Sequence, residues 1–230
     1  MPLLTLKHLS LFLEDELLLD NLNISLNFSE HIAILGRSGC GKSSLLKVIL
    51  GLEHPFRLQG SLSCQASCAY MAQQDALLPW LSVIENVNLS QRLQGNKIAS
   101  KAWKCLEQVG LLPFAYKKPY LLSGGQKQRV ALARTMMQET ELILMDEPFS
   151  AVDAISRIEL QIFTKKILAN RAMILITHDP LEALRLADKI YVIQNKTLTP
   201  PFMSQHIGIH DEITPSVSEL HTQLLQALSL

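Results

Sequence analysis

The hydrophobic pattern of this chain changes its period along the sequence. Apolar and polar residues alternate over 4–13, and the alternation is strict over 22–28. A period of two is typical of strands that bury one face and expose the other, as in antiparallel sheets. We therefore expect two half-buried, antiparallel strands at the start of the fold.

Four later stretches are short and continuously apolar, which is typical of parallel strands buried on both faces. They lie at 32–35, 142–145, 173–176 and 190–193. Stretches with a helical pattern separate several of them, which favours a right-handed α/β core. Three of the runs lead directly into chemically distinctive segments: a glycine-rich loop that starts at Gly36, the carboxylate of Asp146, and the polar residues from Thr177 on. Because ligands bind at the carboxyl ends of parallel strands, these endings predict a single site.

Residues 75–122 show no clear strand pattern and are predicted to be a helical insertion. Within them, 97–109 has helical spacing, with Trp103, Leu106 and Val109 on or near one face. The whole chain is expected to form one unit. Its parts are an α/β core made of 1–74 and 123–198, the insertion at 75–122, and a tail at 199–230.

The tail contains one further amphipathic pattern. Residues 219–228 are predicted to form a helix whose leucines face inward, namely Leu220, Leu224, Leu225 and Leu228. Packing against the domain explains this stripe better than a dedicated partner site does.

Composition narrows the class of protein. The hydrophobic share of 48% suits a packed interior, and the formal net charge of zero gives no sign of a nucleic-acid partner. No apolar run approaches the length of a bilayer span, and the N-terminus lacks the pattern of a signal peptide. We expect a soluble chain that another polypeptide would hold at any membrane where it acts.

The four cysteines do not form a disulfide-framework pattern. Cys64 and Cys68 make a C-x3-C pair with no second pair nearby, so ordinary thiols are favoured over a metal site. A reducing compartment fits this usage.

A glycine-rich loop follows the first apolar run and precedes a helical pattern. Its residues are Gly36, Arg37, Ser38, Gly39, Cys40, Gly41, Lys42 and Ser43, the GxxxxGKS spacing of a P-loop. The glycines let backbone N–H groups surround phosphate oxygens, and the helix N-terminus favours the same anion. Lys42 is predicted to reach the β- and γ-phosphates of a nucleotide and Ser43 to bind Mg²⁺. We include Ser44, the next residue, in this nucleotide site.

Two adjacent carboxylates, Asp146 and Glu147, end the second apolar run. Such a pair is unfavourable unless it meets a cation or a reacting water. The natural division assigns Asp146 to Mg²⁺ and Glu147 to the attacking water. The plainer alternative is a solvated acidic turn.

A second glycine-containing helix start occurs at 122–129. Ser123 is a good N-cap, and Gly124 and Gly125 let the backbone approach an anion, although a merely capped helix would look the same. Residues 122–126 read LSGGQ, and here the chain resembles the ATP-binding subunits of ABC transporters, whose signature is this sequence. The resemblance covers nearly the whole chain and implies a P-loop NTPase, RecA-like core with an N-terminal antiparallel part and a helical subdomain.

The resemblance also implies a site shared by two subunits. In that family two copies pair head to tail around two ATP molecules, and the signature contacts the γ-phosphate held by the other copy. It implies this role for Ser123, Gly124, Gly125 and Gln126. Asp153 matches the D-loop at the dimer seam. His178 matches a switch histidine on the γ-phosphate, with a core histidine as the alternative, and Gln73 matches a glutamine near Mg²⁺ and the water.

The stretch around Trp80 narrows the resemblance. The LLPW sequence at 77–80 and the Asn86-Val87 pair resemble the importers of nitrate, sulfonates and taurine, a group that includes importers of thiamine-pyrimidine precursors. That group implies a homodimer on the cytoplasmic side of the membrane, bound to permease subunits and served by a periplasmic or extracellular substrate-binding protein. The region would line a groove for a coupling helix, although Trp80 could also be a core aromatic.

Three positions depart from the family pattern. The nearest candidate for the aromatic residue that stacks on adenine is Phe12, but the count from the P-loop reaches Leu13. Ser29 replaces a usual glycine, which should alter only a turn, and Thr140 replaces a usual proline. All catalytic positions are filled, which predicts an active ATPase.

Other readings fit the sequence less well. A soluble ABC ATPase acting on DNA or ribosomes would carry coiled coils, tandem cores or a basic surface. A nucleotide-sensing regulator without turnover would not need Glu147 and His178. A P-loop kinase would lack the signature, and the LLPW stretch disfavours an exporter of lipid or lipoprotein.

Overall fold

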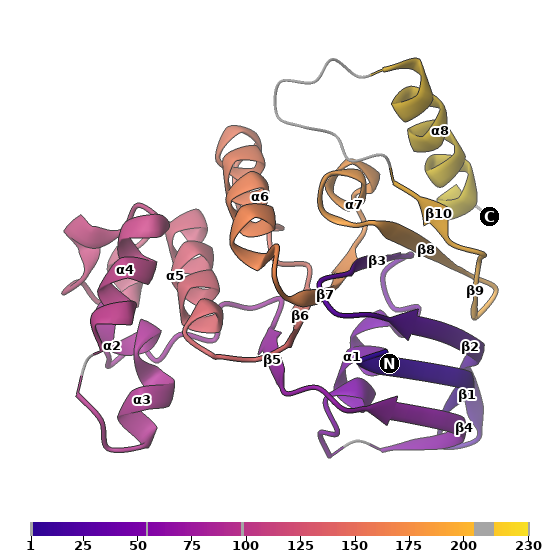
Figure 1. Cartoon of the computed structure of the whole chain (residues 1–230), viewed down its shortest axis with the longest axis horizontal. Helices are drawn as coiled ribbons and strands as arrows, with labels where there is room; N and C mark the ends of the chain where they lie inside the picture. The colour runs from indigo at the N-terminus through magenta and orange to yellow at the C-terminus, as the bar shows by residue number, and fades with distance from the viewer. Residues whose placement is uncertain (1, 54, 98, 205–213, 230) are drawn as a thin grey trace.

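The computed structural model describes residues 2–53, 55–97, 99–204 and 214–229. An antiparallel sheet at one end of the molecule has the strand order β2-β1-β4 (Figure 1). Its strands are β1 (Leu4–Leu13), β2 (Glu16–Leu26) and β4 (Phe56–Cys64). The two alternating stretches are confirmed as β1 and β2, which pair antiparallel.

The larger sheet has the order β10-β8-β3-β7-β6-β5, with β9 paired to β8. Its strands are β3 (His31–Leu35), β5 (Cys68–Met71), β6 (Leu142–Asp146), β7 (Ala172–Thr177), β8 (Lys189–Gln194), β9 (Thr197–Leu198) and β10 (Phe202–Met203). The four apolar runs are confirmed as β3, β6, β7 and β8, and these neighbours pair in parallel. The fully buried patterns of β3, β6 and β7 explain why their sequences do not alternate.

Four strands were not predicted from the sequence, namely β4, β5 and the two-residue strands β9 and β10. In β4 most residues are exposed, and β5 has only four residues. Gly60 in β4 has φ +96, and a Cβ there would lie 2.1 Å from the His8 carbonyl oxygen, so the strand needs glycine to pass β1. Because pairing with β1, rather than burial, holds β4 in place, hydrophobic periodicity did not detect it.

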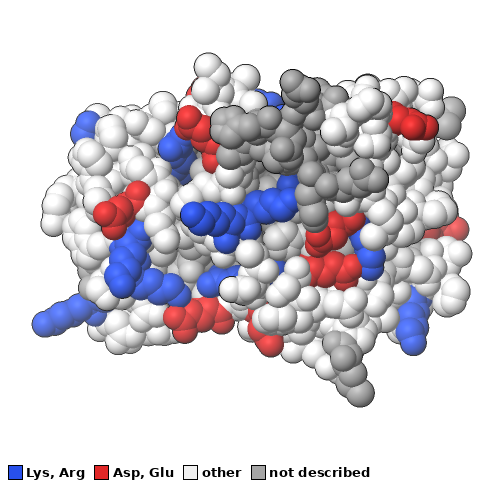
Figure 2. All heavy atoms as spheres, turned by 45° about the horizontal axis from the view of Figure 1, so that its top comes forward, with Lys and Arg blue, Asp and Glu red and all other residues white. Residues whose placement is uncertain are grey.

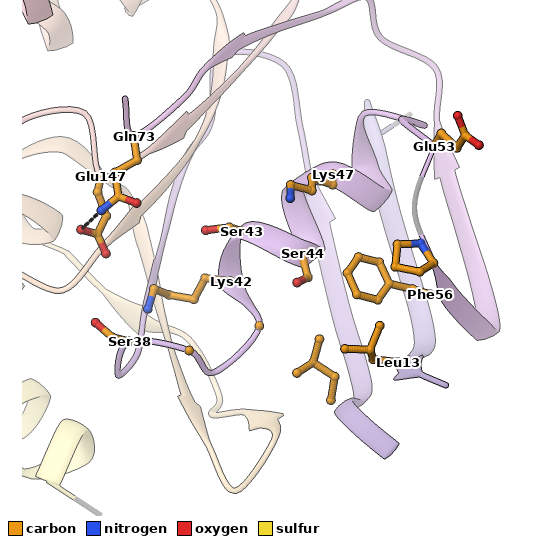
Figure 3. Close-up of a pocket in the computed structure, with 14 residues that line it drawn as sticks. Leu13, Ser38, Lys42, Ser43, Ser44, Lys47, Glu53, Phe56, Gln73 and Glu147 are labelled. Carbon is orange, nitrogen blue, oxygen red and sulfur yellow. Dashed lines mark hydrogen bonds between the residues drawn. The ribbon is translucent and has the colours of Figure 1, made fainter. Parts of the chain in front are cut away.

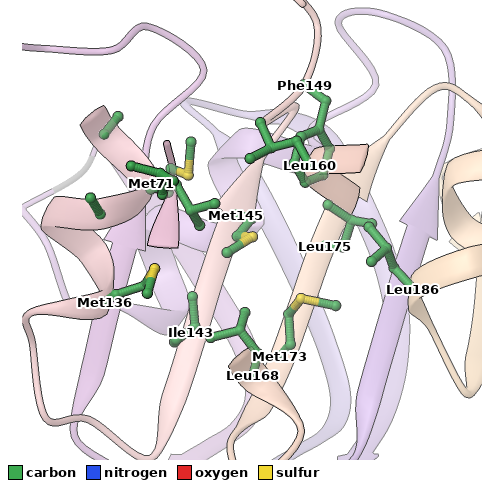
Figure 4. Packing of buried hydrophobic residues seen from close by; sticks show 14 of the residues in the cluster. Met71, Met136, Ile143, Met145, Phe149, Leu160, Leu168, Met173, Leu175 and Leu186 are labelled. Carbon is green, nitrogen blue, oxygen red and sulfur yellow. The ribbon is translucent and has the colours of Figure 1, made fainter. Parts of the chain in front are cut away.

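Two buried clusters lie on opposite faces of the parallel sheet. Ile143 and Met145 belong to one, and Leu142 and Leu144 belong to the other. The first cluster, part of which Figure 4 shows, also takes residues from four helices, α5 (Gly124–Met136), α6 (Ala154–Leu168), α7 (Pro180–Leu186) and α8 (Pro215–Ser229). The second takes residues from β1, β2 and α1 (Lys42–Ile49), so the antiparallel sheet and α1 cover the other face.

The region 75–122 is helical in the described residues and has no strand there. Its elements are α2 (Val83–Val87), α3 (Leu89–Leu93), α4 (Ser100–Gln108) and the 3₁₀ turns η1 (Leu112–Phe114) and η2 (Pro119–Leu121). In α4, which begins later than 97, Leu106 is buried, and Val109 is buried just after it. The next helix, α5 (Gly124–Met136), packs against α2 and α4 as well as β5, so the helical part of the fold continues past 122.

The remaining helices are α6 (Ala154–Leu168), α7 (Pro180–Leu186) and α8 (Pro215–Ser229). The tail helix is confirmed as α8, which packs on β8 and α7 and begins earlier than residue 219. Leu224 is buried, but Leu225 is 47% exposed, so its assignment to the inward face was wrong. Val217 takes the buried position about two turns before Leu224, because the inward stripe follows positions seven residues apart.

The distribution of charged side chains on the surface (Figure 2) agrees with the formal net charge of zero. On the face in Figure 2, basic and acidic side chains are interspersed, and much of the described surface carries neither charge. Among the described helices, none has both the length and the apolar content to cross a membrane. All four cysteines are free thiols, and Cys64 Sγ lies 3.7 Å from Cys68 Sγ.

Candidate functional site

The glycine-rich loop joins β3 to α1 at the carboxyl end of the parallel sheet. Gly39 and Gly41 have φ of +81 and +97, a left-handed conformation that other residues rarely adopt. A Cβ on Gly36 would lie 2.8 Å from Cys40 Sγ, so close packing also requires a glycine at this position. The loop therefore owes its shape to the three glycines of the motif.

Lys42 is the first residue of α1 and is only 5% exposed. Its ammonium donates hydrogen bonds to the carbonyl oxygens of Gly36 at 2.7 Å and Arg37 at 2.9 Å. A buried cation of this kind requires partners that carry negative charge or dipole. The loop carbonyls supply them here, and phosphate oxygens would satisfy the same ammonium more strongly.

A cavity of about 480 Å³ opens beside the loop and α1. Figure 3 shows the lining residues, with Gln73 and Glu147 on one side of α1 and Leu13 and Phe56 on the other. The predicted residues that line it are Ser38, Gly39, Gly41, Lys42, Ser43, Ser44, Gln73 and Glu147. Five lining residues were not predicted, namely Leu18, Lys47, Glu53, Pro55 and Phe56.

Phe12 does not line this cavity, although it was the nearest candidate for stacking on adenine. Successive side chains of a strand point to opposite faces, so Leu13 reaches the cavity while Phe12 points away from it. The Arg57 guanidinium lies over the Phe12 ring, 4.0 Å from its centroid. The structure therefore places Phe12 outside the cavity that the P-loop lines.

Asp146, the last residue of β6, is 4% exposed. The Tyr70 hydroxyl donates a hydrogen bond to its Oδ2 at 3.4 Å. Burial first and the neighbouring Asp146 second raise the pKa of Tyr70 to about 12, so the phenol stays protonated and remains a donor. A buried carboxylate with so weak a partner is a natural ligand for a hard cation.

Glu147 is held in a strained conformation with φ +46, which non-glycine residues rarely adopt. Its N–H donates to the Ile176 carbonyl of β7 at 2.9 Å. Its Oε2 accepts from Gln73 Nε2 at 3.2 Å and lies 3.4 Å from His178 Nδ1. The three residues predicted to be catalytic therefore meet at one carboxylate oxygen.

Glu147 and His178 also line a second, smaller cavity of about 50 Å³. Glu182, which sequence reasoning did not single out, lines it and is 4% exposed. Burial first and the nearby Asp179 next raise the pKa of Glu182 to about 8, while Arg157 opposes the shift. Glu182 Oε1 and Arg157 Nε are both buried without a hydrogen-bond partner.

The signature segment (122–126) forms the start of α5 and lies apart from the P-loop cavity, since none of its residues lines that cavity. Ser123 caps α5, because its Oγ accepts from the Gln126 N–H at 3.3 Å and its own N–H donates to Gln126 Oε1 at 3.0 Å. A Cβ on Gly124 would come within 3.3 Å of the Ala151 carbonyl oxygen. The signature therefore packs against the D-loop (150–153) of its own chain.

The D-loop is held from two sides. Gln128 of α5, with its amide oriented to satisfy both contacts, donates to the Pro148 carbonyl and accepts from the Ala151 N–H, each at 3.2 Å. The Arg157 guanidinium of α6 donates to the Val152 carbonyl at 2.9 Å. Asp153 caps α6 by accepting from the Ser156 N–H at 3.0 Å, and this bond lowers the pKa of Asp153.

Comparison with known proteins decides the family. A model of the ABC transporter family matches residues 19–150. The chain belongs to the ABC transporter family. An ABC transporter ATP-binding protein of Haemophilus influenzae is 45% identical over 195 residues, which cover 83% of this chain and 81% of that protein. The aliphatic sulfonates import ATP-binding protein SsuB 2 of Rhizobium johnstonii is 37% identical over 215 residues, 93% of this chain and 86% of that protein.

Solved ABC structures share the fold. A dimeric ATP-binding cassette in a post-hydrolysis state, bound to ADP and Pi, aligns with a TM-score of 0.76 at 25% identity, covering 89% of this chain and 100% of that one. An ABC transporter in an inward-facing conformation aligns with a TM-score of 0.75 at 26% identity, covering 97% of this chain and 90% of that one. This ABC protein is an ATPase that uses ATP and Mg²⁺.

The residues of this ABC protein fit such a ligand. Lys42 supplies a buried ammonium. The left-handed conformation of Gly39 and Gly41 is typical of loops whose backbone N–H groups point toward an anion. Ser43, Gln73 and Asp146 supply oxygen atoms, the donors that Mg²⁺ prefers. Neither remaining family departure concerns this donor set: Ser29 has φ +58 in a turn, and Thr140 Oγ1 is buried without a partner.

Proposed function

We propose that the P-loop of this chain holds the phosphates of ATP and that Ser43, Asp146 and Gln73 hold Mg²⁺. Support comes from the burial of Lys42 and Asp146 and from the cavity that Ser43 and Gln73 line. When bound there, Mg²⁺ would neutralise part of the negative charge of the phosphates. Lys42 exchanges the carbonyls of Gly36 and Arg37 for phosphate oxygens, which are stronger partners.

Glu147 is the general base in this proposal. The observation that carries it is the convergence of Gln73 Nε2 and His178 Nδ1 on Glu147 Oε2, beside the P-loop cavity. Glu147 orients the attacking water and accepts its proton, while His178 supports the charge that develops on the γ-phosphate. Gln73 lies just before the helical insertion (75–122). A movement of the insertion would therefore shift Gln73 and change its hydrogen bond to Glu147.

A second copy completes the site. The signature has the sequence and geometry of an anion-binding helix start, yet it lies outside the cavity of its own chain. We assign Ser123, Gly124, Gly125 and Gln126 to the γ-phosphate of the partner, with Asp153 at the seam. The dimeric cassette bound to ADP and Pi supports this arrangement.

The helical part is the permease-facing surface in this proposal. Trp80 is 67% exposed, and its carbonyl oxygen accepts a hydrogen bond from Lys118 Nζ at 2.6 Å. Tyr116 and Tyr120, which flank Lys118 in the sequence, are also exposed. Buried Asn86 fixes the turn that carries Trp80, because it accepts from the Leu78 N–H at 2.8 Å and donates to the Ser82 carbonyl at 3.0 Å. An exposed aromatic patch on a rigid turn suits a helix of a partner protein.

The relatives named as aliphatic sulfonate importers support the transport direction and the substrate class. The chain would then act at the cytoplasmic side of the membrane as the energy-coupling subunit of a sulfonate-type importer. A separate substrate-binding protein would deliver the solute to the permease.

A mixing experiment tests the shared site. Lys42→Ala removes a P-loop cation, and Gly124→Asp places a carboxylate where the partner's phosphate would lie, so each variant alone should be inactive. One intact composite site forms when the two are mixed, because it takes its P-loop from one chain and its signature from the other. Recovered ATP hydrolysis supports the proposal. A Gly124→Asp protein with the wild-type rate would refute it.

Transport is tested separately. Addition of the cognate permease should change the ATPase rate of the wild-type chain, and Trp80→Ala should reduce that response without changing the basal rate. The same rate with and without permease would argue against the transport role.

A further inference from the structure

The register of β1 against β4 explains which aromatic side chain faces the nucleotide cavity. Leu13 pairs directly with Phe56, and Phe12 pairs with Arg57. Paired residues of an antiparallel ladder point to the same face, and successive residues point to opposite faces. Leu13 and Phe56 therefore share the face that lines the cavity, whereas the Phe12 ring lies under the Arg57 guanidinium on the opposite face.

The two ends of the cavity differ in chemistry. Lys42, Gln73 and Glu147 supply the charged and polar end. Beyond Ser44 and Lys47, Leu13 and Phe56 form an apolar wall, to which Leu18 and Pro55 also contribute (Figure 3). A ligand with phosphates at one end and an aromatic base at the other would match this division.

We propose that Phe56, at the start of β4, is the aromatic platform on which the adenine of ATP stacks, with Leu13 and Leu18 beside it. The proposal rests on the phosphate assignment made above. Phe56 is half-buried and lines the cavity, whereas Phe12 does not line it and its ring lies under the Arg57 guanidinium. The stacking residue therefore comes from β4 in this chain and not from β1.

Binding affinity tests this assignment without reference to turnover. The dissociation constants of Mg²⁺-ATP and of inorganic tripolyphosphate are measured by calorimetry for the wild type, Phe56→Ala and Phe12→Ala. Stacking of a base on an aromatic side chain is strong enough that Phe56→Ala should weaken ATP binding about tenfold. Tripolyphosphate binding should not change, because it has no base. Phe12→Ala is the matched control and should bind both ligands like the wild type.

Two further variants separate aromatic stacking from packing. Phe56→Tyr keeps the ring and should restore wild-type affinity for ATP, whereas Phe56→Leu keeps only the apolar wall and should behave like Phe56→Ala. Melting temperatures show whether each variant is folded. A Phe56→Leu protein with wild-type affinity for ATP would overturn the proposal, and so would an ATP-selective loss in Phe12→Ala. An equal loss of both ligands in Phe56→Ala would also overturn it.

Lys42→Ala separates this proposal from the phosphate assignment. If the P-loop holds the phosphates, this variant weakens ATP and tripolyphosphate together. Full binding of both by Lys42→Ala would refute the phosphate site, whatever Phe56 does.

Discussion

Two helix starts in this molecule carry glycine-containing, anion-binding sequences, and the structure treats them differently. At α1, the P-loop encloses a buried Lys42 and opens into a cavity that Gln73 and Glu147 also line. At α5, Ser123 and Gly124 are exposed, and this end packs against its own D-loop. Both ends carry glycines at a helix N-terminus, but it is the first that opens into a cavity lined by Lys42 and Glu147.

The difference shows how the work of the site is divided. A helix N-terminus attracts an anion weakly by itself, and convergent charged groups are needed for strong binding. Lys42 and Glu147 supply such groups beside the start of α1, whereas the start of α5 is exposed at the surface.

The largest effect is expected from removing the cation of the P-loop. Lys42→Ala should weaken ATP binding by about a hundredfold or more, because the phosphates lose a buried, charge-assisted hydrogen-bond donor. Calorimetric titration with Mg²⁺-ATP measures this. Lys101→Ala removes a surface cation that pairs with Glu139 and is the control, expected to bind normally. Unchanged affinity in Lys42→Ala would show that the phosphates bind elsewhere.

Glu147→Gln should trap a dimer in which the P-loop of one copy and the signature of the other hold the same ATP. It keeps the shape of the side chain but removes the base, so the hydrolysis rate should fall at least about a hundredfold while ATP still binds. The ATP-bound dimer should accumulate, which a sizing column run with and without ATP detects. Glu141→Gln, an exposed carboxylate that accepts from the Ser67 N–H, is the control. Wild-type turnover in Glu147→Gln would disprove its role as the base.

Most of the phosphate-handling end could be predicted from the sequence because its signals are local. The P-loop spacing, the Asp146-Glu147 pair and His178 each follow a buried strand directly, and the parallel sheet gathers strand ends at one edge. The apolar end could not be predicted in this way. Phe56 reaches the cavity through its pairing with Leu13, a contact between segments more than forty residues apart. Hydrophobic periodicity carries no information on that register.

Other errors have related causes. Leu225 was placed inward because it continues a leucine stripe. In α8, which packs on β8 and α7, Leu224 is buried, and the next residue points about 100° further round the helix and is exposed. Glu182 gave no sequence signal, because a glutamate in the first turn of a helix is usually exposed near the positive end of the dipole. Only the tertiary fold buries it behind His178.

Glu182 lines the small cavity with His178 and with Arg157, which holds the D-loop. Its pKa is raised from 4.5 to about 8 by burial first and then by Asp179, so between these pH values the folded chain keeps a proton that the unfolded chain has released. Stability from this group is therefore full below about pH 4.5 and is lost as the pH rises toward 8. The loss is roughly 1.4 kcal/mol for each pH unit in that window.

Glu182→Gln removes this titration and should flatten the dependence of stability on pH. Urea unfolding of the variant and the wild type at about pH 5, 6, 7 and 8 measures the difference, since the other titrating groups are common to both. Glu141→Gln again serves as the control and should follow the wild type. Parallel curves for Glu182→Gln and the wild type would show that Glu182 is already ionised in the folded state.

The smallest effects come from two capping boxes of the same design. Ser82 caps α2 with Glu85, and Ser123 caps α5 with Gln126. The Ser82 N–H donates to Glu85 Oε2 at 2.7 Å, and this bond is the largest cause of the fall in the pKa of Glu85 to about 2. Ser82→Ala and Ser123→Ala should each destabilise the fold by about 1 kcal/mol, as measured by urea unfolding, because each helix start loses an acceptor for a backbone N–H.

Activity then distinguishes the two caps. Ser82 serves only its own helix, so Ser82→Ala should leave the ATPase rate of the folded dimer unchanged. Ser123 would also face the partner's phosphate, so Ser123→Ala should reduce the rate more than its loss of stability explains. Both rates are measured at a temperature and urea concentration where each variant is fully folded. An equal reduction in the two variants would mean that the signature acts through the stability of α5 alone, and that the outward-facing helix start binds no phosphate.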